Sequence, residues 1–246
     1  MLLLGGGYMV VSMAGKVYKR ISGHEDGALQ LKRASRFIYK DLLQAFYDHV
    51  KVELVPGDQS HAVGMLSAQG GDDAKGGFIY DPDGAPLWQR NVIFYLAAPN
   101  SDTCTMAVDA NGLDDVCPHK TLIRKCVDVP PQNDPTDDPV GPPKDPDLPE
   151  LTLVSLQTYL TRPDGFSLSA MFGAEPDLTA AEIVATNLLY MKVEMTPDVN
   201  YPKEVRVELK AFNQLSSRET KVGTVPLGNH AHTITHVISV FPRNVE

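Results

Sequence analysis

Residues 29–50 constrain the fold of this chain more than any other stretch. They contain no Gly and no Pro and are rich in residues that favour helix. Apolar or weakly polar residues recur at steps of three and four, which is the spacing of one side of an α-helix. These residues are Leu31, Ala34, Ile38, Leu42, Ala45 and His49. The pattern predicts an amphipathic helix whose stripe, Leu31 to Ala45, packs against a sheet.

An apolar segment, residues 1–14, precedes this helix. It holds about 14 apolar or small residues, fewer than the ~20 that cross a bilayer, and it lacks the basic start of a signal peptide. It is either a buried helix of a soluble domain or the later part of a longer hydrophobic helix. Lys16, Lys19 and Arg20 follow at once and favour the second interpretation. Residues 1–22 are therefore expected to lie in a membrane or a filament core, and the expected assembly residues are Leu3, Leu4, Tyr8, Val10 and Val11.

The rest of the chain has the pattern of antiparallel strands. Residues 90–98 and 120–129 are rich in β-formers, and residues 203–213 alternate strictly between apolar and charged. Residues 178–195 begin with an Ala-rich, helix-like stretch and become β-like at 188. Further strands are expected at 50–58 (or a helix exit), 61–68, 76–84 and 232–244. The order of a helix followed by strands predicts an α+β fold.

Composition and charge limit the function. The chain has 246 residues and a formal net charge of −9, the opposite of what a nucleic-acid backbone attracts. Residues 128–150 contain eight Pro and six Asp and cannot form the interior of a helix or sheet. They are expected to be a solvated loop within a globular domain of residues 23–246.

Three cysteines, Cys104, Cys117 and Cys126, are too few for a disulfide scaffold. Cys104 and Cys117 bracket a short loop and are the preferred pair for a disulfide, while three free thiols are the open alternative. No nucleophile elbow or Cys–His signature is present, which argues against an enzyme.

Two clusters resemble metal sites. Asp109, Asn111, Asp114 and Asp115 offer the oxygen ligands that Ca²⁺ takes, but the run lacks the last Glu of an EF-hand loop. His230, His232 and His236 alternate, as strand residues on one face do, without a carboxylate or Cys nearby in sequence. A solvated turn and a solvent-facing strand are the favoured interpretations, so no metal or cofactor is predicted.

Several short motifs resemble those of the type IV pilin superfamily. Residues 34–46 resemble its arginine-bearing helix that ends in an Asp-Leu pair, here Asp41-Leu42. Residues 94–96 and 122–124, in strands 89–97 and 120–128, resemble its Tyr-Tyr-Leu and Leu-x-Arg signatures. The last strands and the ending Pro-Arg-Asn (242–244) resemble the same family, more narrowly the minor pseudopilins of type II secretion, J type, and related minor pilins.

This resemblance implies a long N-terminal α-helix packed on an antiparallel β-sheet with long irregular loops. It also implies a non-enzymatic subunit in the tip complex of a type II secretion pseudopilus or a type IV pilus-like filament. Such a subunit is made as a prepilin, is cut after a Gly by a membrane peptidase and is methylated. It partners with other minor subunits. It is held in the inner membrane by its first helix, with a periplasmic globular domain.

The chain departs from the family at its start, because no cleavage Gly followed by a Glu at the fifth mature position is present. A missing upstream part would explain this departure. The rival hypotheses are a periplasmic or surface ligand-binding or adhesion module on a helical stalk, and a secreted hydrolase with an unrecognised site.

Overall fold

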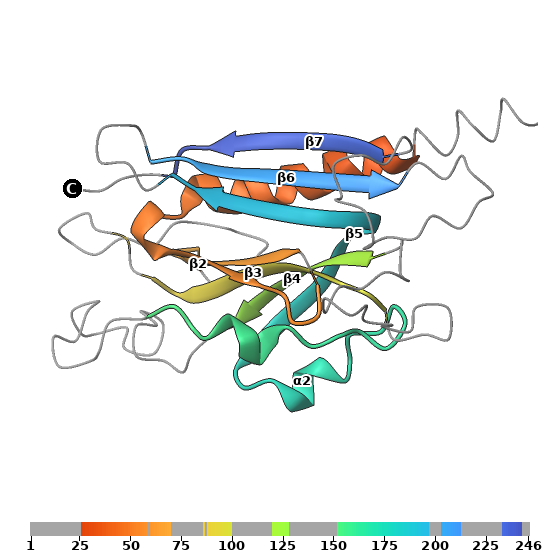
Figure 1. Ribbon diagram of the computed structural model, residues 1–246. Helices are drawn as coiled ribbons and strands as arrows, with labels where there is room; N and C mark the ends of the chain where they lie inside the picture. Colours follow the sequence, from red (N-terminus) through yellow and green to blue (C-terminus); the bar gives the residue numbers. More distant parts are fainter. Residues whose placement is uncertain are drawn as a thin grey trace, which may run out of the picture.

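The computed structural model describes residues 26–58, 60–69, 86, 88–99, 120–127, 152–196, 203–212 and 233–242. In these residues seven antiparallel strands form one sheet, which curls into a half-barrel (Figure 1). A helix of residues 26–44 packs against the sheet. The strands are β1 (Val50–Leu54), β2 (His61–Ser67), β3 (Arg90–Ala97), β4 (Lys120–Val127), β5 (Leu178–Met195), β6 (Val205–Phe212) and β7 (Thr233–Val240).

The sheet is a simple meander, because its strands lie side by side in chain order from β1 to β7. The long strand β5 joins its two halves: the first part pairs with β4 and the last part with β6. Asn187 has a positive φ of 58°, a left-handed conformation that Asn adopts more readily than most residues, and the β5–β6 register shifts next to it. β5 bends through this region, which turns β6 and β7 away from the plane of β2–β4 (Figure 1).

Hydrogen bonds hold the curl by joining the start of β2 to the far half of β5. The Val193 N–H donates to His61 Nδ1 at 3.1 Å, and the Met191 N–H donates to Ser60 Oγ at 3.4 Å. At the end of the helix a short 3-10 turn, η1 (Tyr47–His49), adds a third link. The Tyr47 hydroxyl donates to the carbonyl of Thr196 at 2.6 Å.

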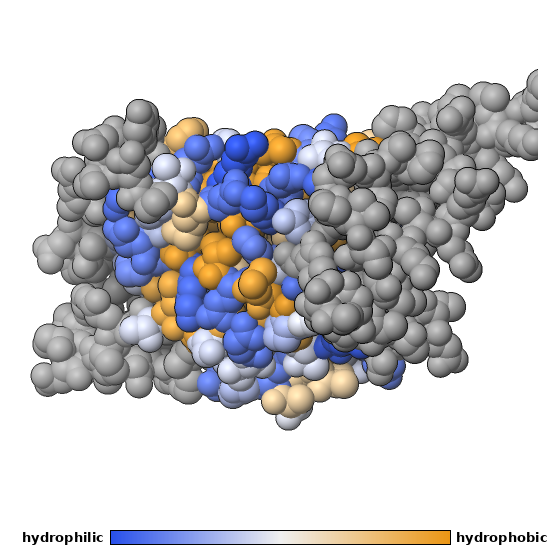
Figure 2. All heavy atoms as spheres, viewed as in Figure 1, coloured by the Kyte–Doolittle hydropathy of each residue, from blue (hydrophilic) through white to orange (hydrophobic). Residues whose placement is uncertain are grey.

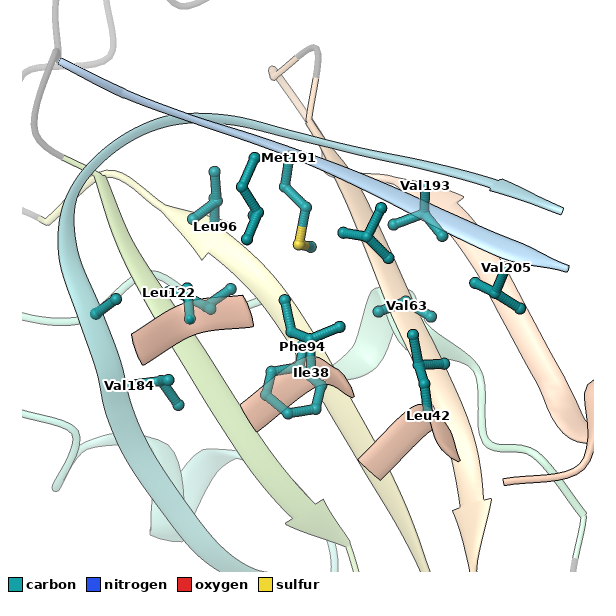
Figure 3. Close-up of a cluster of buried hydrophobic side chains, with 14 of the residues drawn as sticks. Ile38, Leu42, Val63, Phe94, Leu96, Leu122, Val184, Met191, Val193 and Val205 are labelled. Atoms are coloured by element: carbon teal, nitrogen blue, oxygen red, sulfur yellow. The ribbon is translucent and has the colours of Figure 1, made fainter. Parts of the chain in front are cut away.

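The central strands are buried on both faces, because each face has its own cover. One face carries the larger core cluster and packs against the helix, as Figure 3 shows for Ile38 and Leu42 among side chains from β2 to β6. The other face is covered by residues 152–177, which include η2 (Leu156–Tyr159) and α2 (Met171–Ala174). Gly64 on β2 allows this cover to approach, since a Cβ there would overlap the side chain of Leu156.

The expected α+β, pilin-like fold, with a long N-terminal helix packed on an antiparallel sheet and long irregular loops, is wrong. The architecture is mainly the curled seven-stranded sheet, and residues 26–44 form the one substantial helix among the described residues. The helix ends before the predicted residue 50, since Phe46 is extended and η1 leads directly into β1. The strong helical pattern in the sequence therefore predicts an element that is small compared with the sheet.

The helix-like start predicted for residues 178–195 is also wrong, because the whole segment is strand β5. Residues 178–188 pair with β4, and this tertiary pairing overrides the local preference of an Ala-rich stretch for helix. The expected segment of residues 1–22, the strand at 76–84 and the Pro/Asp-rich loop of residues 128–150 lie outside the described residues.

Candidate functional site

The five helix residues expected to pack on the sheet line the side of the helix that faces the sheet. Each is at most 2% exposed and belongs to the larger core cluster with residues of the strands. Burial of such side chains at about 25 cal/mol per Å² is a large stabilising term for this contact. These residues are Leu31, Ala34, Ile38, Leu42 and Ala45.

A buried ion pair joins the same helix to β4. Arg124 Nε lies 2.7 Å from Asp41 Oδ2, and both side chains are at most 10% exposed. Arg124 Nη1 also donates to Glu182 Oε1 on β5 at 3.2 Å, while that glutamate side chain is 46% exposed. Burial by itself would lower the pKa of Arg124, but Asp41, with smaller contributions from Cys126 and Glu182, raises it. The guanidinium is therefore a permanent cation that fixes the helix to two strands.

The next residue of β4 forms a second buried ion pair on the opposite face. Lys125 Nζ lies 2.6 and 2.8 Å from the two carboxylate oxygens of Glu175, and it donates to the Tyr159 carbonyl at 2.6 Å. It also lies 4.9 Å from the centroid of the Tyr95 ring. Burial lowers the pKa of Lys125 and Glu175 opposes that shift, while burial, then Glu175, raises the pKa of Tyr95. This pair fixes the cover of residues 152–177 to the sheet.

A third ion pair lies at the start of β4. Lys120 contacts Asp58, and both side chains are less than 10% exposed. The Ser60 N–H donates to Asp58 Oδ1 at 2.9 Å. A cavity of about 190 Å³ adjoins the pair, and Arg162 at its wall donates to the carbonyls of Ala98 and Pro99. The polar groups here hydrogen-bond to the protein itself, which is typical of structural ion pairs.

The outer side of the helix is basic, in contrast to the chain as a whole. Seven residues of the helix line a groove of about 660 Å³. Four of them are cations in a chain of net charge −9, so this side can attract carboxylates. The seven residues are Leu29, Gln30, Lys32, Arg33, Arg36, Phe37 and Lys40.

Large apolar side chains are exposed on the cover of the opposite face. Phe166 is 71% exposed at a turn, and Phe172 is 47% exposed in α2. The surface over α2 is coloured as hydrophobic in Figure 2. Exposed aromatic residues of this kind are common at contacts between proteins.

Most of the other residues singled out in the sequence lie outside the described part of the chain. They are Leu3, Leu4, Tyr8, Val10, Val11, Cys104, Cys117, Asp109, Asn111, Asp114, Asp115, His230 and His232. Of the rest, Cys126 is buried on β4 and His236 is exposed on β7. Within the described ranges, no group of three or more His, Cys, Asp or Glu side chains could hold a metal ion.

The sequence patterns did not predict the partners in the three ion pairs. Arg124 was identified only as part of a family signature, and neither Lys120 nor Lys125 was singled out. The available signal was the presence of three cations in β4, a strand whose other residues are mostly apolar. Charges in such a strand must find partners when both of its faces are covered.

Protein-family models, curated proteins and solved structures gave no match to this chain. In the ranges that the structure covers, no helix combines the length and apolar character needed to cross a membrane.

Proposed function

We propose that this chain is a structural subunit of a filament: a minor pseudopilin or minor pilin in the tip complex of a type II secretion pseudopilus or a type IV pilus-like filament. Its partners would be other minor subunits. An N-terminal segment would hold it in the inner membrane with the globular part in the periplasm.

One observation carries the proposal. Two charged residues from separate motifs of the resemblance, Asp41 of the Asp-Leu pair and Arg124 of the Leu-x-Arg signature, are partners in a buried ion pair of 2.7 Å. A chance resemblance of two short motifs gives no reason for them to meet. Their contact supports the interpretation that the two motifs act together to fix the helix to the sheet.

The shape of the contact also supports an assembly role. The helix is held on one side by the core and by Arg124, while its other side carries Lys32, Arg33, Arg36 and Lys40. A helix held in this way can transmit force between the sheet and whatever precedes residue 26. Its cations are available for contacts with acidic neighbouring subunits.

The test is cross-linking of the tagged full chain in cells that produce it, followed by purification and mass spectrometry. We expect other prepilin-type subunits among the cross-linked proteins, in larger amounts for the wild type than for Asp41→Asn. Lys203→Ala, which removes an exposed pair with Asp48 at 2.9 Å, is the matched control and should behave as the wild type. Recovery of no prepilin-type subunit, together with normal secretion and filaments after deletion of the gene, would overturn the proposal.

A second candidate is a ligand-binding or adhesion module, and the basic groove of about 660 Å³ along the helix favours it. Isothermal titration calorimetry of the full chain with polyglutamate tests this function. Saturable binding that is lost in Lys32→Glu/Arg36→Glu and kept in Lys203→Glu would favour the binding module over the filament subunit.

A further inference from the structure

Within the part of the chain that the structure describes, the last strand of the sheet is paired along one edge only. β7 pairs with β6 alone in the described part of the chain, and it forms the uppermost strand in Figure 1. All eight of its residues are in continuous register with β6, without a bulge. An open edge presents backbone N–H and C=O groups, whose natural partner is another extended polypeptide.

The opposite edge of the sheet, β1, has features that discourage pairing. Lys51 and Glu53 place charges on this strand and lie 2.6 Å apart. The cover also reaches this edge, because Gln157 Nε2 donates to the Leu54 carbonyl at 3.1 Å and to Glu53 Oε2 at 2.9 Å. Charges and side-chain caps are the usual means by which proteins protect an edge strand.

Among the described residues, β7 has neither the charges nor the side-chain caps that β1 has. Its sequence, TITHVISV, contains no Lys, Arg, Asp, Glu, Pro or Gly and is rich in β-branched residues. Thr235, His236, Val237 and Ser239 are exposed. Val237 is 42% exposed.

The strand is partly symmetric about Val237, at the second and third positions on either side. Two residues before and after it are Thr235 and Ser239, both hydroxyl residues, and three residues away are Ile234 and Val240, both β-branched and apolar. If two such strands run antiparallel with their Val237 residues opposite each other, Thr235 faces Ser239 and Ile234 faces Val240, whereas His236 faces Ile238 on either side of the axis. Such matched pairs stabilise antiparallel sheets.

We propose that β7 is a homotypic docking edge, which pairs antiparallel with β7 of a second copy of this chain about a two-fold axis at Val237. A two-fold axis normal to the sheet keeps the helix-covered faces of both copies on the same side. The result is one continuous sheet across two subunits. The proposal goes beyond the filament function and depends only on the strand itself.

The strength of this contact follows from its size and charge. One pair of eight-residue strands buries less than a standard interface, so the expected Kd is roughly 10 µM to 1 mM. The contact itself is uncharged, whereas each copy carries a net charge of −9. Salt screens the repulsion between the copies, so dimerisation should strengthen as ionic strength rises.

The first experiment measures dimerisation of the full chain by sedimentation equilibrium. Val237→Lys places two like charges opposite each other at the axis and should weaken the dimer at least tenfold. Leu54→Lys is the matched control, because Leu54 is an apolar residue of the other edge strand and is 59% exposed. Equal dimerisation of the wild type and Val237→Lys, or a wild type that stays monomeric to about 1 mM, overturns the proposal.

The second experiment tests the register by mild oxidation of cysteine variants. In Val237→Cys the two new thiols face each other and should form an intersubunit disulfide. In Ser239→Cys the two thiols are four residues apart along the paired strands, roughly 13 Å, and should not. The wild type gives the background from its own cysteines. Equal cross-linking of the two variants, or none above background, contradicts the register at Val237.

Discussion

Two neighbouring residues of β4, Arg124 and Lys125, hold opposite sides of the molecule by different means. Arg124 fixes the helix through Asp41 and shares its charge with Glu182, which is partly exposed to water. Lys125 fixes the cover of residues 152–177 through Glu175 and one carbonyl, and neither side chain of this pair is more than 2% exposed. If Asp41 is removed, Arg124 still has Glu182 as a partner. Among the described residues, Lys125 has no carboxylate partner other than Glu175. The two covers should therefore differ in how much they lose when an anion is removed.

The largest effect is expected for Glu175→Gln. This change keeps the shape of the side chain but leaves Lys125 as a buried cation without an anion. Loss of one partner of a buried pair costs about 3–5 kcal/mol of unfolding free energy. Urea denaturation followed by circular dichroism measures it.

The matched control for Glu175→Gln is the double variant Lys125→Met/Glu175→Leu, which removes both charges and keeps similar volumes. It should recover most of the loss, because a buried pair replaced by apolar side chains is often close to neutral. A double variant as unstable as the single one would show that packing, and not charge, makes the contact essential.

A smaller effect is expected for Asp41→Asn, which removes the main anion of the helix contact. Arg124 keeps Glu182 at 3.2 Å and some access to water. The expected loss is roughly 2 kcal/mol, in the range for a hydrogen bond to a charged group. A loss equal to that of Glu175→Gln in the same urea experiment would remove the distinction between the two contacts.

The two contacts should also differ in their response to pH. Burial lowers the pKa of Lys125 in the folded protein. At pH values between this lowered pKa and the normal lysine pKa, the unfolded chain therefore binds more protons than the folded one. The contribution of Lys125 to the free energy of unfolding therefore increases as the pH rises toward the normal lysine pKa. In Glu175→Gln, which lacks the opposing carboxylate, the unfolding free energy should recover in part between neutral pH and pH ~10. Relative to the wild type at each pH, Asp41→Asn should show no such recovery, because arginine does not titrate in this range.

The smallest effect is expected for Glu182→Gln. The side chain of Glu182 is 46% exposed and is the second partner of Arg124. Solvent-exposed ion pairs contribute about 0–1 kcal/mol, so the midpoint of urea unfolding should hardly move. A loss above about 2 kcal/mol would mean that Glu182, rather than Asp41, anchors the guanidinium.

Local patterns in the sequence determined several elements of this protein. The spacing of Leu31, Ala34, Ile38 and Leu42 indicated a helix with one apolar side, and the side chains on that side lie in the core. β-branched runs indicated β3 and β4, and strict alternation indicated β6. These features depend on residues close together in the chain, so a sequence can display them directly.

Only the tertiary structure decided the architecture and the partners of the charges. The curl depends on the bend in β5 near Asn187, and an Ala-rich stretch becomes strand because β4 lies beside it. Arg124 and Asp41 are 83 residues apart, and Lys125 and Glu175 are 50 apart. Local sequence patterns do not predict partners so far apart in the chain. The partner of a buried charge depends on which segment covers that face of the sheet, and this is a property of the tertiary structure.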